Sequence, residues 1–187
     1  MGMPLAHRRF TVDEYHRMGE AGVLREDDHV ELIDGQIVEM TPIGPAHAGC
    51  VKDLVRLLHR SAGDAVLLGV QDPVVLGTYV APEPDVAVLR PRPGGYRDRH
   101  PEPADILLII EVADTSLEYD RSVKIPRYAS AGIPEVWLVN LPDRHVAVYR
   151  HPKPDGYTQV TIVTRGATLT PLALPNARLS VDEILDG

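Results

Sequence analysis

The sequence predicts an α/β fold, and three observations lead to that expectation. The segment 105–140 contains an apolar strand, a helix and a second apolar strand, which is the pattern of a βαβ crossover with a parallel strand pair. Near the N-terminus, an Asp-Gly pair between two short apolar segments is typical of a β-hairpin. Later in the chain, 145–149, 157–163 and Leu169 are interpreted as antiparallel edge strands. We therefore expect a single domain over residues 1–187, with a mixed central sheet and flanking helices.

Composition sets limits on this domain. With 187 residues and 44% hydrophobic content, the chain can bury one sizeable core. Cys50 is the lone cysteine, so an internal disulfide is excluded and a reducing cytoplasm fits. No hydrophobic stretch approaches the ~20 residues of a membrane span. We expect a soluble cytoplasmic protein with no membrane partner.

The formal net charge of −8 disfavours a protein that binds nucleic acid through phosphate neutralisation. The charge is unevenly distributed, because segment 20–39 holds seven acids against Arg25 alone and so carries six of the eight excess negative charges. The loop after Asp85 collects basic residues: Arg90, Arg92, Arg97, Arg99 and His100. Another group, Arg121, Lys124 and Arg127, lies on the helix of the βαβ unit. Such groups either face nucleic acid or are simply solvated surface.

The N-terminal elements have clear sequence signals. Thr11-Val12-Asp13-Glu14 forms a capping box, with Phe10 and Tyr15 placed as a hydrophobic staple, so a helix is predicted over about 12–20. The hairpin follows, with strands at 30–33 and 36–40. Its turn, Asp34-Gly35, suits a two-residue type I′ geometry. In that register Glu31 lies opposite Val38 on the facing strand.

The middle of the chain alternates helix and short strands. Apolar residues recur at helical spacing from His47 to His59, which predicts a second helix with one buried stripe. Short strands are expected at 66–70, 74–76 and 86–89, followed by an exposed loop at 91–95.

The βαβ unit and the C-terminus complete the expected elements. The unit comprises a buried strand at 106–112, a helix over about 121–131 and a strand at 136–139. At the C-terminus, Ser180-Val181-Asp182-Glu183 is a second capping box that predicts a short closing helix.

Two carboxylates and a lysine suggest the chemistry. Glu111 ends a five-residue aliphatic run, where an ionised carboxylate is costly unless a cation or hydrogen-bond donors meet it. Parallel units place ligands at the carboxyl ends of their strands. Asp85 and Glu111 could hold a Mg²⁺ that accepts phosphate oxygens, and Lys124 could orient the attacking water and stabilise the developing charge. This combination outlines a site for phosphodiester hydrolysis.

Spacing supports these assignments but leaves alternatives open. Asp120, Lys124 and Tyr128 share one helix face, from which Lys124 could lean over the end of the Glu111 strand. Glu31, on the hairpin, is a candidate third carboxylate. Asp85 after Pro84 is also a common turn pair, Lys124 also suits a solvated helix lysine, and Glu31 also suits a plain edge-strand charge.

At these residues the chain closely resembles the Uma-two family, within the PD-(D/E)xK, or restriction-endonuclease-like, superfamily. The segments that carry the likeness are Glu31 to Gly35, His47, Gln71-Asp72-Pro73, Pro82-Glu83-Pro84-Asp85, Glu111 to Ser116, Asp120 to Lys124 and Ala131 to Val139. The resemblance spans nearly the whole chain, and its specificity comes from several motifs occurring in order. It implies a restriction-endonuclease-like α/β core with Asp85 and Glu111 in a metal site and Glu31 as the additional acid.

The chain departs from the superfamily pattern at one position. In the simple Glu-x-Lys form, a lysine would occupy position 113, which here is Ala113. The resemblance then implies that Lys124 supplies the amine from the following helix. His47 and Gln71 also match the family pattern. His47 either belongs to the site or caps and packs its helix, and Gln71 either touches substrate or ties down backbone.

The resulting interpretation is a metal-dependent phosphodiester hydrolase, and more narrowly a DNA endonuclease, with Mg²⁺ as cofactor and Mn²⁺ able to substitute. The expected catalytic residues are Glu31, Asp85, Glu111 and Lys124, of which Asp85 and Glu111 are the metal ligands. Because cutting both strands of a duplex generally takes two active sites, a homodimer is expected. Two alternatives remain: a nuclease-like fold that binds DNA or protein with little catalysis, and a hydrolase of small phosphate esters.

Overall fold

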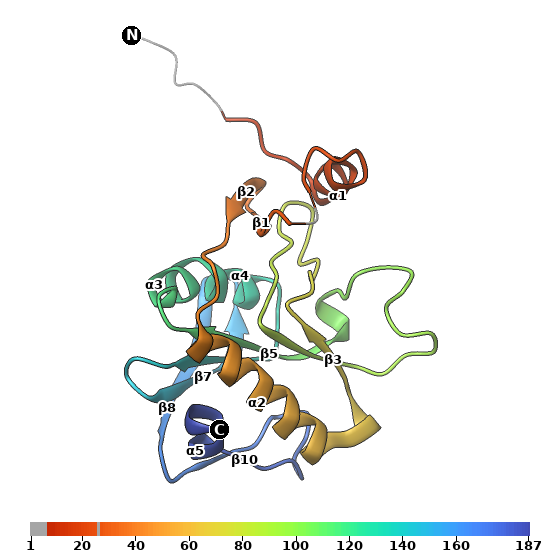
Figure 1. Ribbon diagram of the computed structural model, residues 1–187. Coiled ribbons are helices and arrows are strands. Elements are labelled where there is room, and N and C mark those ends of the chain that lie inside the picture. The colour runs from red at the N-terminus through yellow and green to blue at the C-terminus, as the bar shows by residue number, and fades with distance from the viewer. Residues whose placement is uncertain (1–6, 26) are drawn as a thin grey trace.

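The computed structural model describes residues 7–25 and 27–187, so Met1 to Ala6 and Glu26, one of the seven N-terminal acids, lie outside the described residues. A six-stranded sheet in the order β3-β4-β5-β6-β7-β8 forms the centre (Figure 1). Its strands are β3 (Leu67–Val70), β4 (Val86–Leu89), β5 (Ile106–Ala113), β6 (Glu135–Asn140), β7 (His145–Lys153) and β8 (Gly156–Thr164). The helices are α1 (Val12–Glu20), α2 (Pro45–Ala62), α3 (Leu117–Tyr119), α4 (Ile125–Ser130) and α5 (Val181–Asp186), with 3-10 turns at Gly63–Ala65 and Pro103–Asp105.

The sheet is mixed, as predicted. β5 and β6 run parallel, with Glu111 opposite Leu138, while every other neighbouring pair in the sheet is antiparallel. The connection from β5 to β6 passes through α3 and α4, which confirms the βαβ crossover. β5 is buried along all eight residues, which explains why its sequence is an aliphatic run rather than an alternating pattern.

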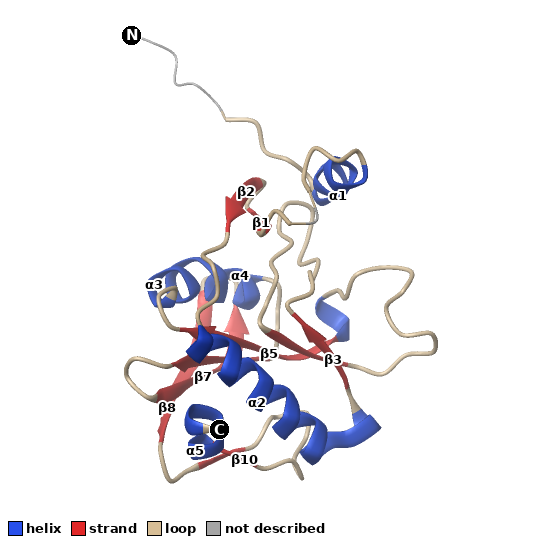
Figure 2. Ribbon diagram, in the orientation of Figure 1, coloured by secondary structure: helices blue, strands red, loops and turns tan. Residues whose placement is uncertain are grey.

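Helices cover both faces of the sheet (Figure 2). On one face, Leu54 and Leu58 of α2 and Ile184 of α5 pack against the strands in one apolar cluster. On the other face, Ile125 and Tyr128 of α4 pack in a second cluster. α2 extends beyond the predicted segment at both ends, beginning at Pro45, which suits the first turn of a helix. None of the described helices is both long and apolar enough to cross a bilayer.

The N-terminal helix and hairpin lie at the top of Figure 1 and have a small apolar cluster of their own. The capping box is present, because the Thr11 hydroxyl accepts from the amide of Glu14 at 3.2 Å and the Glu14 carboxylate accepts from the amide of Thr11 at 3.0 Å. Phe10 and Tyr15, the predicted staple, both pack in the apolar cluster that contains Leu32. The helix therefore begins where the sequence predicts.

The hairpin has the predicted register and turn. β1 (Val30–Ile33) pairs with β2 (Gln36–Glu39), and Glu31 lies opposite Val38. Asp34 and Gly35 both have positive φ, 52° and 78°, as a type I′ turn requires. A Cβ at Gly35 would lie 2.6 Å from the Cβ of Arg9, so the segment before α1 crosses directly over this turn.

Three local predictions were wrong. Segment 74–76 is not a strand, because its amides bond to loop carbonyls instead: Val74 to Pro82 at 2.9 Å and Val75 to Pro101 at 2.8 Å. Leu169 does not extend the central sheet. It lies in β9 (Thr168–Leu169), which pairs with β10 (Leu179–Ser180) over the α2 face.

The third error concerns the second capping box. The predicted closing helix is present as α5, but the Ser180 side chain makes no capping bond to it. The first-turn acid Asp182 binds outward instead, accepting from the amide of Gly166 at 2.7 Å and from Arg165 at 2.8 Å.

Gly35 gives a direct test of the hairpin. Gly35→Ala should lower the free energy of unfolding by about 1–3 kcal/mol, because it adds positive-φ strain and a clash with Arg9. Gly19→Ala is the matched control, since Gly19 lies in α1 with nothing within 4 Å of an added Cβ. That control should be neutral or stabilising by about 0.5–1 kcal/mol. Urea unfolding followed by circular dichroism measures both changes, and equal values for the two variants would contradict the turn geometry.

Candidate active site

Asp85 lies just before β4 and is fixed by three donors. Its Oδ2 accepts from the backbone amide of Val112 on β5 at 2.8 Å and lies 3.0 Å from Nε2 of His47 on α2. Its Oδ1 accepts from the Gln71 side chain at 3.2 Å. His47 and Gln71, whose roles the sequence left open, are thus brought to the same carboxylate. Asp85 is therefore more than a turn residue, since it ties β4 to β5 and to the start of α2.

Glu111 lies beside Asp85 and is 2% exposed. Its Oε1 is 2.8 Å from Nζ of Lys124 and accepts a hydrogen bond from the Tyr128 hydroxyl. Its Oε2 receives only a long contact of 3.4 Å from the amide of Asp85. The two carboxylates predicted from the sequence thus converge at one end of β5, and one oxygen of Glu111 is poorly satisfied by the protein.

Lys124 is buried, with 5% exposure, and the local backbone explains how it reaches the strand end. The predicted helix 121–131 begins earlier, at Leu117, and contains a π-helical segment, Asp120–Lys124. The amide of Ile125 bonds to the carbonyl of Asp120, five residues back. Such wide turns are frequently found at functional sites. A solvated helix lysine is excluded by the burial.

The Lys124 ammonium also links Glu111 to the hairpin. Its Nζ lies 3.6 Å from Oε2 of Glu31 and donates to the carbonyl of Glu83 at 3.2 Å. Glu31 is 1% exposed, and its carboxylate accepts from the Tyr119 hydroxyl at 2.8 Å and from the amide of Glu83 at 3.1 Å. Glu31 is therefore a buried member of this cluster, and not an exposed edge-strand charge.

Burial and charge act against each other in the cluster. Burial raises the pKa of Glu111 to about 8, although the nearby Lys124 ammonium works in the opposite direction. For Lys124, burial favours the neutral amine, but Glu111, Glu31 and Asp120 outweigh it and the pKa is raised. Burial also opposes ionisation of Asp85, yet the hydrogen bond with His47 prevails and its pKa is lowered. Lys124 therefore keeps its proton, whereas Glu111 ionises only near pH 8 and above, so the negative charge of the cluster increases as the pH rises.

Sequence reasoning missed three contributors. Tyr119 bonds to Glu31, and Glu83 lies close enough for burial and the charge of Glu31 to raise its pKa to about 7. Asp120, expected on a helix face and within a motif but without a role of its own, is 4% exposed and accepts from the Ser116 hydroxyl at 2.6 Å. The available signal was position in the chain, since Glu83 and Asp120 lie within the motif segments and Tyr119 lies next to one.

Ala113, at the usual lysine position, is fully buried in the apolar cluster beneath α4. It packs in the same cluster as Ile125 and Tyr128, which flank Lys124 on the helix side. The helix that carries Lys124 therefore covers the position where a strand lysine would stand. The amine reaches Glu111 from α4 and its π-helical start instead.

The donor set suits a hard cation. Within residues 7–25 and 27–187, no three His, Cys, Asp or Glu side chains are grouped to hold a metal ion. Mg²⁺, however, commonly keeps several waters and uses only one or two carboxylates together with substrate phosphates. Asp85 and Glu111 provide two adjacent carboxylates, and Oε2 of Glu111 has spare acceptor capacity. These residues could therefore hold a metal ion whose remaining coordination positions are filled by water and substrate phosphate.

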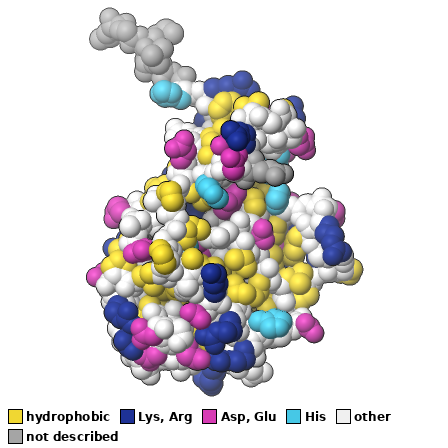
Figure 3. Space-filling view, in the orientation of Figure 1, with side chains coloured by type: hydrophobic (Ala, Val, Ile, Leu, Met, Phe, Trp, Pro, Cys, Tyr) yellow, Lys and Arg dark blue, Asp and Glu magenta, His cyan; other side chains and the backbone are white. Residues whose placement is uncertain are grey.

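The basic loop after β4 is largely neutralised by its own contacts. Arg92 pairs with Asp98 at 3.0 Å, and Arg99 pairs with Asp105 at 2.6 Å. Arg90 donates to the carbonyl of Ala104 at 3.0 Å. On the face shown in Figure 3, basic and acidic side chains are interspersed. These contacts favour the interpretation of the loop as a self-stabilised surface.

Comparison with known proteins identifies the family. The Uma2 family, described as "Putative restriction endonuclease", matches residues 12–182. The chain belongs to this family. A crystal structure titled as a "putative nuclease belonging to DUF820", from Anabaena variabilis, is similar in fold, with a TM-score of 0.71 and 16% sequence identity. The similarity covers 94% of this chain and 97% of that one. No curated protein matches the chain.

The ion pair between Lys124 and Glu111 can be tested by stability alone. At pH 9, where Glu111 is ionised, Lys124→Met should lower the free energy of unfolding by about 3 kcal/mol, because it leaves a buried carboxylate without its cation. Lys124→Met/Glu111→Gln should recover most of that loss, because neither charge remains. Lys52→Met, at an exposed lysine of α2, is the control and should change stability by less than about 0.5 kcal/mol. Denaturant titration measures all three, and a double variant no more stable than Lys124→Met would contradict the pairing.

Proposed function

We propose that the protein is a metal-dependent phosphodiester hydrolase of the PD-(D/E)xK type, acting on DNA as an endonuclease. The observation that carries the proposal is the buried Lys124 ammonium, 2.8 Å from Glu111, at the strand end where Glu111 meets Asp85. A lysine and two carboxylates, brought together from the residue before β4, from β5 and from the following helix, are costly to desolvate. Family membership supports a nuclease function as the reason why these charges are kept buried.

Asp85 and Glu111 are the residues that would hold Mg²⁺ or Mn²⁺. Such an ion, when bound, polarises a phosphate oxygen and neutralises charge that develops on it. His47, Gln71 and the amide of Val112 orient Asp85 from three directions, so its carboxylate has little freedom to rotate. Fixed ligand orientation of this kind typically contributes strongly to metal affinity.

In this proposal Lys124 orients the attacking water and stabilises the charge that develops on the phosphate. Its ammonium group offers three donors, of which two are directed to Glu111 and to the carbonyl of Glu83. The remaining donor capacity can hold a water or a phosphate oxygen. Glu31, held by Tyr119, keeps the ammonium group from rotating away and is the assisting acid.

One observation favours a second candidate, a nuclease-like fold that binds DNA or protein without efficient catalysis. Every oxygen of Asp85 and Glu111 already has a protein donor within 3.4 Å, so metal entry must compete with internal bonds. A hydrolase of small phosphate esters is a third possibility. It would act on a nucleotide analogue and leave plasmid DNA intact.

The proposal extends to location and assembly. A single buried cysteine is compatible with a reducing cytoplasm. A homodimer would supply the two active sites that double-strand cleavage generally needs.

Metal binding gives the first test of the proposed function. Mg²⁺ or Mn²⁺ should raise the melting temperature, because a cation that binds only the folded protein stabilises it and relieves repulsion between Asp85 and Glu111. The shift should vanish in Asp85→Asn/Glu111→Gln and persist in Asp64→Asn, a change at an exposed acid. Differential scanning fluorimetry with and without metal measures it. A parent protein that does not respond would overturn the two-ligand assignment.

Activity gives the second test. Lys124→Ala should lower the rate of Mn²⁺-dependent plasmid nicking roughly 10²-fold or more, as expected for loss of one positioned electrostatic group. Metal-induced thermal stabilisation should remain, which also shows that the variant is folded. Glu111→Ala is the inactive reference, and Lys52→Ala, at an exposed lysine, should nick at the parental rate. Unchanged nicking by Lys124→Ala would remove this lysine from the mechanism. A folded parent that binds metal and cuts neither plasmid nor a nucleotide analogue would favour the binding module.

A further inference from the structure

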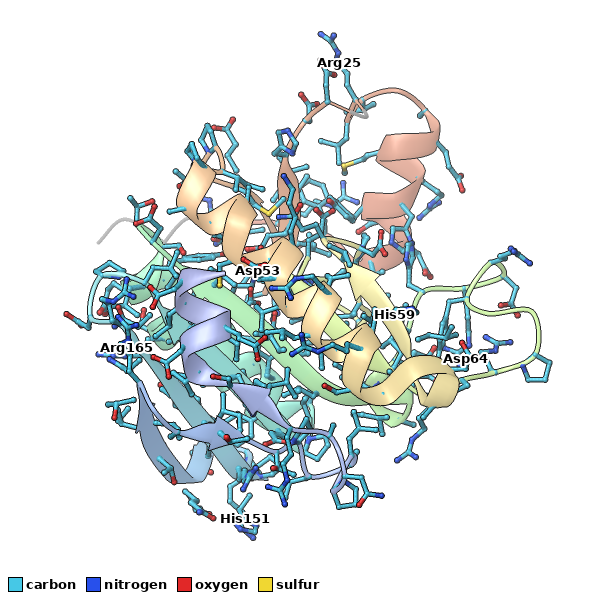
Figure 4. All side chains as sticks on the ribbon, turned by 60° about the horizontal axis from the view of Figure 1, so that its bottom comes forward. Arg25, Asp53, His59, Asp64, His151 and Arg165 are labelled. Carbon is cyan, nitrogen blue, oxygen red and sulfur yellow. The ribbon has the colours of Figure 1, made fainter. Side chains whose placement is uncertain are left out.

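The outer edge of β8 is a long strand edge without a partner among the described residues. β8 is the last strand of the sheet and pairs on one side only, with β7. Five consecutive residues in its middle, 158–162, are exposed. In Figure 4, Arg165 and His151 mark opposite ends of the β7–β8 strand pair at the rim of the molecule. The edge therefore has backbone groups that no other described strand pairs with.

The sequence of β8 lacks the usual protection of an edge strand. Proteins commonly protect such edges with charged residues, prolines or very short strands. β8 has nine residues, Gly-Tyr-Thr-Gln-Val-Thr-Ile-Val-Thr, with no charge and no proline. The opposite edge strand, β3, has only four residues. Of the two edges, β8 alone is long, uncharged and rich in β-branched residues, which favour strand pairing.

Two exposed aliphatic side chains add an apolar contact to this edge. Val160 is 50% exposed and Ile162 is 54% exposed. They pair with Tyr149 and Ala147 on β7, so both project from the same face of the sheet. Exposed aliphatic residues at alternate positions of an edge strand form a stripe that a neighbouring strand would cover.

We infer that β8 is the dimerisation edge and that its partner is β8 of a second copy of this chain, paired antiparallel about a two-fold axis. A two-fold axis places each residue opposite a residue of the same strand, so a charged edge would bring like charges together. β8 carries no charge to repel itself. With Thr161 on the axis, Val160 of each copy faces Ile162 of the other, and the two stripes cover each other. The central sheets would then join into one continuous sheet.

This interface would leave the candidate active site free. Glu111 lies on β5, and β6 and β7 separate β5 from β8 in the sheet. Changes at the edge should therefore alter assembly without altering the chemistry at one site. The inference can fail while the proposed hydrolase activity stands, and the reverse also holds.

The first experiment measures mass in solution. Light scattering coupled to size exclusion, at micromolar concentration, should give the parent protein twice the monomer mass of 20.5 kDa. Val160→Lys/Ile162→Lys should run at the monomer mass, because it places like charges across the axis. Val23→Lys is the matched control, an exposed aliphatic residue outside the sheet at 68% exposure, and it should remain dimeric. Circular dichroism and single-strand nicking verify that the double variant is folded and retains the parental rate at each site.

The second experiment tests the pairing itself. Thr161→Cys should form an intermolecular disulfide on mild oxidation, because a residue on the axis faces its own copy at about 4.5–5.5 Å between Cα atoms, within the range that a disulfide spans. The native Cys50 is buried, so the parent protein should not cross-link. Thr158→Cys, which faces position 164 in this register, should cross-link at least tenfold less. A monomeric parent, or a dimer that survives the double lysine substitution and does not cross-link through position 161, would overturn the inference.

Discussion

The burial of the Glu111 carboxylate is the constraint on which the rest of the site depends. A carboxylate at the end of a strand that is buried on both faces must find a cation or donors, and Glu111 finds Lys124 and Tyr128. The lysine in turn brings its own desolvation cost, which Glu31 and the carbonyl of Glu83 offset. The buried Glu111 thus accounts for the burial of Lys124 on the crossover helix. Lys124 in turn accounts for the burial of Glu31 on the hairpin.

The hairpin is therefore part of the site despite its distance from the βαβ unit in the chain. Glu31 joins it to Lys124 and Tyr119, and Asp34 in its turn pairs with Arg127 of α4 at 2.5 Å. Both contacts attach β1 and β2 to the same crossover helix. The type I′ turn at Asp34-Gly35 fixes the register that directs Glu31 inward, so a local turn preference has a consequence for the charge balance of the site.

Local signals predicted the elements well, and long-range contacts less well. The capping box at Thr11, the Asp34-Gly35 turn and the aliphatic run before Glu111 each depend on neighbours in the chain, and all three appear in the structure as expected. Segment 74–76 is apolar like a strand, but the Val74 and Val75 amides bond to the carbonyls of Pro82 and Pro101, which its own pattern does not reveal. The π-helical turn before Lys124 likewise leaves no periodicity signal, and the Asp85 carboxylate that pairs with His47 lies 38 residues away in the chain.

Burial of a carboxylate does not by itself indicate a functional site, and Glu135 shows the difference. Glu135, at the start of β6, is fully buried, as Glu111 is almost fully. Its Oε1 accepts from Arg150 at 2.6 Å and from the Trp137 indole at 3.0 Å, and its Oε2 accepts from the amide of Leu172 at 2.7 Å. Both oxygens are therefore satisfied at short range, as a structural ion pair requires. Glu111 instead lies at the carboxyl end of its strand, the side on which such sheets bind ligands, and its Oε2 has only a 3.4 Å contact with the Asp85 amide. The two glutamates have similar burial and opposite positions on parallel strands, and only Glu111 has acceptor capacity left for something the protein does not supply.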